Sequence, residues 1–517
     1  MQASSRIVVN TITQYARSII NMLLSLYSSR LVLNYLGVED YGIYSLVAGV
    51  VGMLSFLTNS LVGSTQRFLS VNQGKGNLQI LKEVFSNSLL LHLILGLLIS
   101  IILESCTYFI FDDVLVIPAN RLDVAIILYQ QVIWMVYISL IASPFRALLV
   151  SRENIVYISV IDVIDGVLKV CCIACIPLFA SDRLLMYGWI MFGIQCFSLL
   201  AFMSYCYLKY EECILPKLKY FTWDYLIELS AYTGWVIYSA ATIASRNQGL
   251  AIVLNRFFGT AMNAAYGIGN QISGMLSFVC TSFTNAISPQ LMAAEGAGNR
   301  DKMLRLAEIQ SKYSFLLLSM FAVPSIFEVK NLLTLWLGQV PDGAVLFASA
   351  FIIMQTVDQL SQGLGIANRA IGHIGKYTLI TYTPKLLILP LGWYVLRLNY
   401  PLFYLVALMV ALEYFCMLLR IFLFRNFDGF NVSLYCRNVL LKTIMPIVLS
   451  SVGCFFLCMV ITSVWRFVLT FIISITIFLI STYFLSLKAG ERELMKMLIK
   501  RIIALLKNKR YGKIIRF

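Results

Sequence analysis

A long internal repeat is the sequence feature that most constrains this chain. The pentapeptide GMLSF occurs at Gly52–Phe56 and again at Gly274–Phe278, 222 positions later. The same offset pairs Gly37 with Gly259, and further matches surround both copies. A repeat of this length indicates duplication of a whole structural unit rather than a shared short motif.

The composition indicates a membrane protein. The 517 residues are 60% hydrophobic and only 13% charged, with a mean hydropathy of +0.82. Apolar runs of about 20 residues recur along the chain, long enough to cross the hydrocarbon layer as helices. We predict fourteen spans, with approximate centres at Met22, Met53, Leu95, Ile133, Leu168, Phe197, Tyr238, Leu276, Leu317, Ile353, Ile388, Leu408, Val448 and Ile475.

The repeat groups these spans into two lobes. An offset of 222 residues over six spans leaves a normal spacing for a helix and its loop, and an even number of spans makes the repeat parallel. The predicted fold is an all-α polytopic membrane protein with two pseudo-symmetric six-helix lobes and two extra C-terminal helices. The predicted domains are an N-terminal lobe (1–215), a C-terminal lobe (216–430), helices 13 and 14 (431–487) and a basic amphipathic cytoplasmic tail (488–517).

Lys and Arg set the predicted orientation. With both termini inside, 28 of the 40 Lys and Arg residues fall in cytoplasmic segments and 6 in external ones. This bias predicts that both termini are cytoplasmic. The net charge of +15 therefore reflects membrane topology, and because the basic residues are dispersed over short loops we expect no nucleic-acid partner.

The sequence indicates that the protein is not an enzyme. It has no H-E-x-x-H, G-x-S-x-G or Walker motif. The GKGN segment at Gly74–Asn77 lacks the spacing of a phosphate loop, and its counterpart GAGN at Gly296–Asn299 suggests that both are turns between helices. The external loops are too short for a catalytic domain. We therefore expect the chain to move a molecule across the membrane, with no cofactor.

A polar stripe follows the first helix. At 100° per residue its members share an arc of about 120° and include one positive charge. The stripe consists of Asn10, Thr13, Gln14, Arg17, Asn21, Ser25 and Ser28.

The seventh helix, equivalent to the first by the repeat, has a similar stripe. One face carries Trp235, Ser239, Thr242, Arg246 and Gly249. Because charge is costly in hydrocarbon, an Arg on each stripe predicts a positive, water-filled cavity between the lobes. Under the structural alternative, the hydroxyl groups bond between packed helices and each Arg pairs with a carboxylate.

Further ionisable residues lie inside predicted spans. Asp162, Asp165 and Lys169 occupy the fifth span, and Asp358 and Lys385 occupy the tenth and eleventh. With an offset of 220, Asp165 and Lys385 are equivalent. The pattern is equally consistent with an inter-lobe ion-pair network that opens and closes during coupling or gating and with static salt bridges.

Two segments carry a resemblance to a known family. The stretch RLVLNYLGVEDYGIYSLVAGVVGML, followed by STQRFLS at Ser64–Ser70, resembles the start of the Wzx-type O-antigen and capsular polysaccharide flippases. These proteins belong to a transporter superfamily that also contains the multidrug and toxin extruders and the lipid II flippases. The resemblance covers essentially the whole chain.

The resemblance implies an alternating-access flippase for surface polysaccharide synthesis. Its substrate would be a polyprenyl-pyrophosphate-linked oligosaccharide, moved from the cytoplasmic to the outer leaflet and coupled to a proton or sodium gradient. Membrane lipids, a polysaccharide polymerase and chain-length proteins are the other implied partners. Arg17 and Arg246 suit an anionic pyrophosphate, and Trp235, Tyr238 and Tyr266 would offer a sugar stacking surfaces. The alternative is a cation-coupled multidrug exporter of the same fold.

The charge bias makes a testable prediction about topology. Single cysteines at Asn77 and Asn299 should be labelled only from the cytoplasmic side, because both follow turns that the bias places inside. Impermeant maleimide applied to intact and to permeabilised cells measures this. Labelling of either position in intact cells would overturn the orientation.

Overall fold

A computed structural model describes residues 3–52, 55–111, 117–178, 182–214, 218–337, 340–372, 374–461, 466–487 and 490–493. Within these residues every regular element is a helix. The predicted amphipathic part of the tail, from residue 494 onward, lies outside the described residues. The all-α polytopic fold predicted from the sequence is confirmed.

The helices follow one another with short connections. In chain order they are α1 (Ala3–Gly52), α2 (Ser55–Lys75), α3 (Leu78–Ser105), α4 (Thr107–Phe109), η2 (Ala119–Arg121), α5 (Leu122–Ser151), α6 (Ile155–Ala174), η3 (Ile176–Leu178), α7 (Arg183–Lys209), η4 (Leu218–Tyr220), α8 (Trp223–Gly296), α9 (Arg300–Phe327), α10 (Val329–Leu337), α11 (Ala344–Ile371), α12 (Ile374–Tyr382), η5 (Thr383–Leu387), α13 (Ile388–Arg397), α14 (Leu402–Phe424), α15 (Val432–Tyr435), η6 (Cys436–Leu441), α16 (Lys442–Val460), α17 (Arg466–Ser481) and η7 (Thr482–Ser486).

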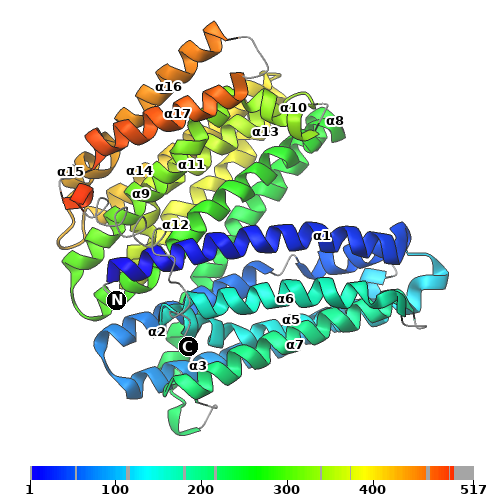
Figure 1. Ribbon diagram of the computed structural model, residues 1–517. Coiled ribbons are helices and arrows are strands. Elements are labelled where there is room, and N and C mark those ends of the chain that lie inside the picture. The colour runs from blue at the N-terminus through cyan, green and yellow to red at the C-terminus, as the bar shows by residue number, and fades with distance from the viewer. Residues whose placement is uncertain are drawn as a thin grey trace, which may run out of the picture.

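Two repeated glycines divide the long elements α1 and α8 into two helical segments each. Gly37 lies inside α1 with φ 82° and ψ 174°, and Gly259 lies inside α8 with φ 76° and ψ −168°. This region of backbone space is essentially restricted to glycine. At each glycine the chain reverses direction, so that α1 and α8 each contain parts of two predicted spans (Figure 1).

The helices form two bundles that are close together at one end and apart at the other (Figure 1). The N-terminal bundle contains α1 to α7, and the C-terminal bundle contains α8 to α14. The N-terminus lies at the end where the bundles meet. Helices α16 and α17 pack against each other and against α9 of the C-terminal bundle.

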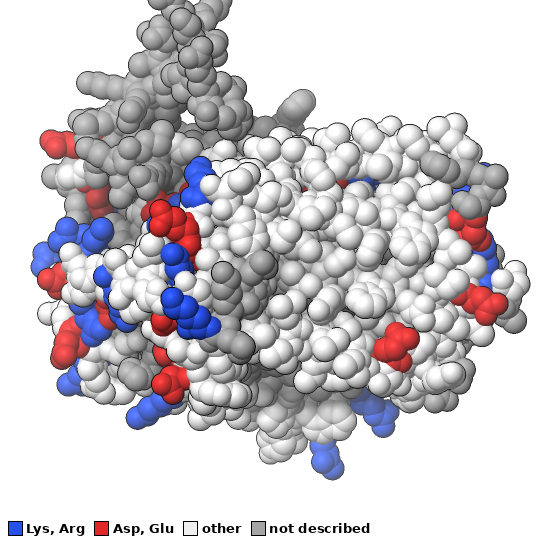
Figure 2. Space-filling view, turned by 90° about the horizontal axis from the view of Figure 1, so that it is seen from below, with Lys and Arg blue, Asp and Glu red and all other residues white. Residues whose placement is uncertain are grey.

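The outer surface fits a membrane. Among the described residues, eight helices are long and apolar enough to cross a bilayer, or nine if the bent pair α9 and α10 forms one span. Figure 2 shows a broad uncharged band between two charged ends of the molecule, with most charged side chains of this view at the end that holds the N-terminus. The protein is therefore a multi-pass membrane protein.

A charged cluster ties three helices together at the opposite end of the N-terminal bundle. Arg121 donates hydrogen bonds to Asp40 on α1 and to Asp182, which caps α7. Burial raises the pKa of Asp182, but its bonds with Arg121 and with the backbone amides of Leu184 and Leu185 outweigh burial and hold that pKa below its ordinary value. The cluster fixes the ends of these helices relative to one another.

The reversal at Gly259 predicts a local cost of substitution. Gly259→Ala should lower stability by roughly 1–3 kcal/mol, because alanine disfavours this backbone conformation. The thermal midpoint of the purified protein in detergent measures the effect. Gly234→Ala on the same helix is the control, since a Cβ there meets nothing within 4 Å and its φ is ordinary. Equal midpoints for the two variants would contradict the role of Gly259.

Candidate functional site: a polar cavity in the C-terminal lobe

Three charged side chains inside the N-terminal lobe form a compact cluster. Arg17 on α1 lies 2.6 Å from Asp162 on α6, and Arg146 on α5 lies 2.7 Å from the same carboxylate oxygen. The side chain of Arg17 is 18% exposed and that of Arg146 is 38% exposed. Two cations thus share one carboxylate, which leaves the cluster with a formal charge of +1.

The other predicted site residues of this lobe take different positions. Asn21 turns its carbonyl oxygen toward Gly166 on α6, whereas Ser25 is exposed. Asp165 accepts a hydrogen bond from Ser198 on α7. Lys169 is partly buried and makes no ion pair with any described residue. Much of the polar stripe on α1 therefore packs within its own lobe.

A polar cavity of about 610 Å³ opens in the C-terminal lobe. Both halves of α8, together with α11, α12, η5 and α14, supply its walls. Amide and hydroxyl side chains form much of the lining: Asn247, Asn270, Ser273, Ser277, Thr281, Thr284, Asn285, Gln355, Gln359 and Gln362. Such groups donate and accept hydrogen bonds, as a polar substrate requires.

A network of ion pairs forms the charged wall of the cavity. Lys385 lies 2.5 Å from Glu413 and 3.7 Å from Asp358. Arg246 contacts the other oxygen of Glu413 at 3.3 Å, and Arg420 lies 2.7 Å from Asp358. The side chains of Lys385 and Glu413 are only 6% and 5% exposed. Burial of these charges is tolerated because each has an opposite charge within reach.

The cavity has an excess of positive charge. Its lining contains the cations Arg246, Arg369, Lys385 and Arg420 and the carboxylates Asp358 and Glu413. Four positive charges against two negative ones leave a formal charge of +2. Such a cavity attracts anions and repels cations.

The remaining predicted residues of α8 are used in packing. Ser239 donates to the carbonyl of Val236, and Thr242 donates to that of Tyr238, both within the helix. Trp235 packs against Gly375, where an added Cβ would lie 2.8 Å from its ring. None of Trp235, Ser239 and Thr242 lines the polar cavity. The aromatic side chains that do line it are Phe351 and Tyr382, which sequence reasoning missed.

Two details of the predicted site concern ion pairs and depth. The ion pairs of Asp162, Asp358 and Lys385 join helices of one lobe, which favours static salt bridges over an inter-lobe network for these described residues. Arg17 lies 20 residues before Gly37, whereas Arg246 lies 13 residues before Gly259. At 1.5 Å per residue, this seven-residue difference places the two Arg residues about 10 Å apart in depth along equivalent helices.

Several cavity residues could have been found from the sequence. Asn270, Ser273, Ser277, Thr281 and Thr284 recur every three or four positions in the second half of α8, the spacing of one helical face. The same spacing of three or four residues on α11 indicates a second polar face, formed by Gln355, Asp358, Gln359 and Gln362. Arg420 carried such a signal, because Glu413 lies seven residues before it on the same helical face, whereas Arg146 stands alone in an apolar stretch.

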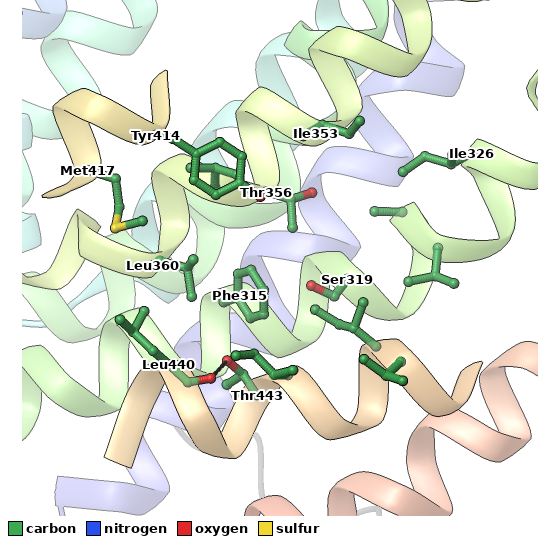
Figure 3. Close-up of a pocket in the computed structure, with 16 residues that line it drawn as sticks. Phe315, Ser319, Ile326, Ile353, Thr356, Leu360, Tyr414, Met417, Leu440 and Thr443 are labelled. Carbon is green, nitrogen blue, oxygen red and sulfur yellow. Dashed lines mark hydrogen bonds between the residues drawn. The ribbon is translucent and has the colours of Figure 1, made fainter. Parts of the chain in front are cut away.

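A second cavity, of about 410 Å³, is apolar (Figure 3). Phe315 and Ser319 on α9, Thr356 and Leu360 on α11, and Thr443 on α16 surround it (Figure 3). Its α11 residues lie on the opposite face of that helix from those of the polar cavity. The helix therefore separates the two cavities, and only the polar one offers groups that recognise charge.

Solved structures share this arrangement. No protein-family model and no curated protein matches the chain. A MATE transporter in the bent conformation is similar with a TM-score of 0.73 and 15% identity, over 84% of this chain and 97% of that chain. The outward-facing conformation of a multidrug resistance MATE family transporter of the MOP superfamily gives 0.70 and 14%, over 84% and 97%.

A third structure widens the comparison. It is a MOP superfamily transporter from Pyrococcus furiosus, described by the reverse polarity of its binding pocket, with a TM-score of 0.70 and 15% identity over 82% of this chain and 96% of that chain. At these identities the likeness concerns the fold. The chain has the fold of the MATE transporters, as the sequence resemblance to their superfamily predicted.

The ion-pair network predicts a large effect of removing Glu413. Glu413→Ala should destabilise the protein by roughly 3–5 kcal/mol, because Lys385 and Arg246 lose their closest carboxylate. Thermal unfolding in detergent measures this, and Glu104→Ala at an exposed position of α3 is the control. The double variant Lys385→Met, Glu413→Leu should recover most of the loss. A wild-type midpoint for Glu413→Ala would show that the network does not stabilise the lobe.

Proposed function

We propose that this protein is an alternating-access flippase for an anionic, lipid-linked oligosaccharide. The observation that carries the proposal is the cavity of about 610 Å³ with four cationic and two anionic side chains in its lining. A multidrug exporter of cations favours an acidic cavity, which is the opposite polarity. The MATE-type fold supports movement of a substrate between two bundles, and the sequence resemblance supports a polyprenyl-pyrophosphate carrier for surface polysaccharide synthesis.

The cavity chemistry fits both parts of such a substrate head group. The guanidinium of Arg246 is 16% exposed and supplies charge-assisted hydrogen bonds for a pyrophosphate. The amide and hydroxyl side chains of α8 and α11 suit the hydroxyl groups of a sugar. The polyprenyl chain would stay in the bilayer. Coupling to a proton or sodium gradient belongs to the same proposal.

The proposed topology indicates which side of the membrane the structure is open to. If the end with the N-terminus faces the cytoplasm, the bundles are closed on that side and separated toward the outer leaflet (Figure 1). This is the state in which a flippase releases its substrate. The proposed setting is the bacterial inner membrane, with a polymerase and chain-length proteins as later partners of the exported sugar.

Replacement of Arg246 tests the proposed substrate. Arg246→Ala should lower the rate of lipid-linked oligosaccharide flipping in proteoliposomes roughly tenfold or more, because a charged hydrogen bond to the pyrophosphate is lost. The variant should still fold, since Glu413 keeps Lys385 as its partner at 2.5 Å. Lys should restore part of the rate and Glu should be the worst substitution, because it repels the anion.

A second variant, at Arg17, and an efflux assay with cationic dyes distinguish the two candidate functions. Arg17→Ala should also reduce flipping, and Arg305→Ala, an exposed change away from the cavity, should not. If Arg17→Ala and Arg246→Ala both retain full flipping, the anion-cavity proposal fails. If neither affects sugar transport but both alter efflux of cationic dyes, the multidrug-exporter alternative is favoured.

A further inference from the structure

The two lobes touch through glycines that the repeat places in equivalent positions. A Cβ added to Gly74 on α2 would lie 2.0 Å from the carbonyl oxygen of Ala293 on α8. A Cβ added to Gly296 would lie 1.8 Å from the carbonyl oxygen of Val71. Both Gly74 and Gly296, and Val71 and Ala293, are 222 residues apart. The contact is therefore made twice, once in each direction, around the pseudo-two-fold axis.

Arg67 on α2 reaches across the same interface to the end of α11. Its Nε donates to the carbonyl of Arg369 at 3.0 Å, and its Nη2 donates to that of Ala370 at 3.3 Å. These carbonyls belong to the last turn of α11, the negative end of the helix dipole. Gly372 ends the helix with φ 99°, and an added Cβ there would lie 2.2 Å from Arg67 Nη2.

Gln290 on α8 makes the reciprocal contact. Its Nε2 donates to the carboxylate of Glu153 at 3.0 Å. Glu153 lies in the turn after α5 with φ 58°, and α5 is the counterpart of α11 in the N-terminal lobe. The two turn residues, Glu153 and Gly372, are 219 positions apart, and Arg67 and Gln290 are 223 apart. Each lobe thus contacts the C-terminal end of an equivalent helix in the other lobe, α11 in one case and α5 in the other.

We propose that Arg67 and Gln290, with the Gly74 and Gly296 contacts between them, form a two-way latch. It holds the lobes together at the end that contains the N-terminus. The inference rests on the proposed function only in that transport requires the lobes to separate at this end. It assigns a role to Arg67, which lies in the STQRFLS segment and takes no part in the polar cavity.

The chemistry of the latch suits a contact that must open. Arg67 is 6% exposed and Gln290 is 8% exposed in the closed arrangement. The latch joins the last turn of α11 and the turn after α5, at the ends of these helices, so separation of the lobes transfers these polar groups into water rather than into hydrocarbon. The glycines allow the backbones to meet closely, which excludes water from the contacts while the lobes stay together.

A substitution at the glycine contact tests the interface more specifically than removal of Arg67. Gly74→Ala should weaken the closed state because its methyl group cannot fit against Ala293, although alanine favours the helix itself. Gly63→Ala on the same helix is the matched control, since a Cβ there meets nothing within 4 Å. Any opening that Gly74→Ala causes and Gly63→Ala does not is therefore due to the interface.

Spin labels at Gln79 and Asp301 measure the opening. Both residues are exposed, begin α3 and α9, and are 222 positions apart. Unnatural amino acids carry the labels, so that the twelve native cysteines remain in place. Electron double resonance on the purified full-length protein should give mainly short distances for the wild type. Arg67→Ala should raise the ratio of long to short distances roughly tenfold, and Gly74→Ala should raise it in the same direction.

The outcomes decide the proposal. Long distances that grow in Arg67→Ala, Gln290→Ala and Gly74→Ala but not in Gly63→Ala support the latch. Unchanged distances in Gln290→Ala and Gly74→Ala overturn it, even if Arg67→Ala fails to fold. The measurement needs no substrate, so loss of the proposed sugar transport and loss of the latch are read independently.

Discussion

The cost of an unpaired charge inside the membrane governs how this protein is built. Arg17 and Arg146 converge on Asp162 in one lobe, and Lys385, Arg246 and Arg420 share Asp358 and Glu413 in the other. In both of these clusters the cations outnumber the carboxylates. Pairing makes burial tolerable, and the surplus leaves positive potential available to an anion. Structural stabilisation and anion attraction are thus properties of the same residues rather than competing explanations.

The global architecture could be predicted because it rests on signals that are local in the sequence. Apolar runs report helices that cross the membrane, and the 222-residue offset reports two lobes. Gly37 and Gly259 could be paired from the sequence alone, and both occupy a backbone region that other residues disfavour. A repeat in sequence therefore became a repeat in backbone geometry.

The site could be predicted only in part, because side-chain partners depend on helix rotation and depth. Arg246, Asp358 and Lys385 do line the polar cavity, whereas Trp235 is held against Gly375 by close packing. The sequence could not reveal which carboxylates Arg146 and Arg420 contact, because that depends on how the helices pack against one another. The difference in depth between Arg17 and Arg246 does follow from the sequence, because the 222-residue offset pairs Arg17 with Ser239 rather than with Arg246.

The turn at Gly259 has a mechanical consequence for a lobe that moves. Gly259 alone joins two long helical segments, so there is no loop between them that could absorb a tilt of one segment. A tilt of the segment that carries Arg246 therefore also tilts the segment that carries Gly296. The cavity that Arg246 lines and the contact that Gly296 makes with the other lobe are therefore connected through the single residue Gly259.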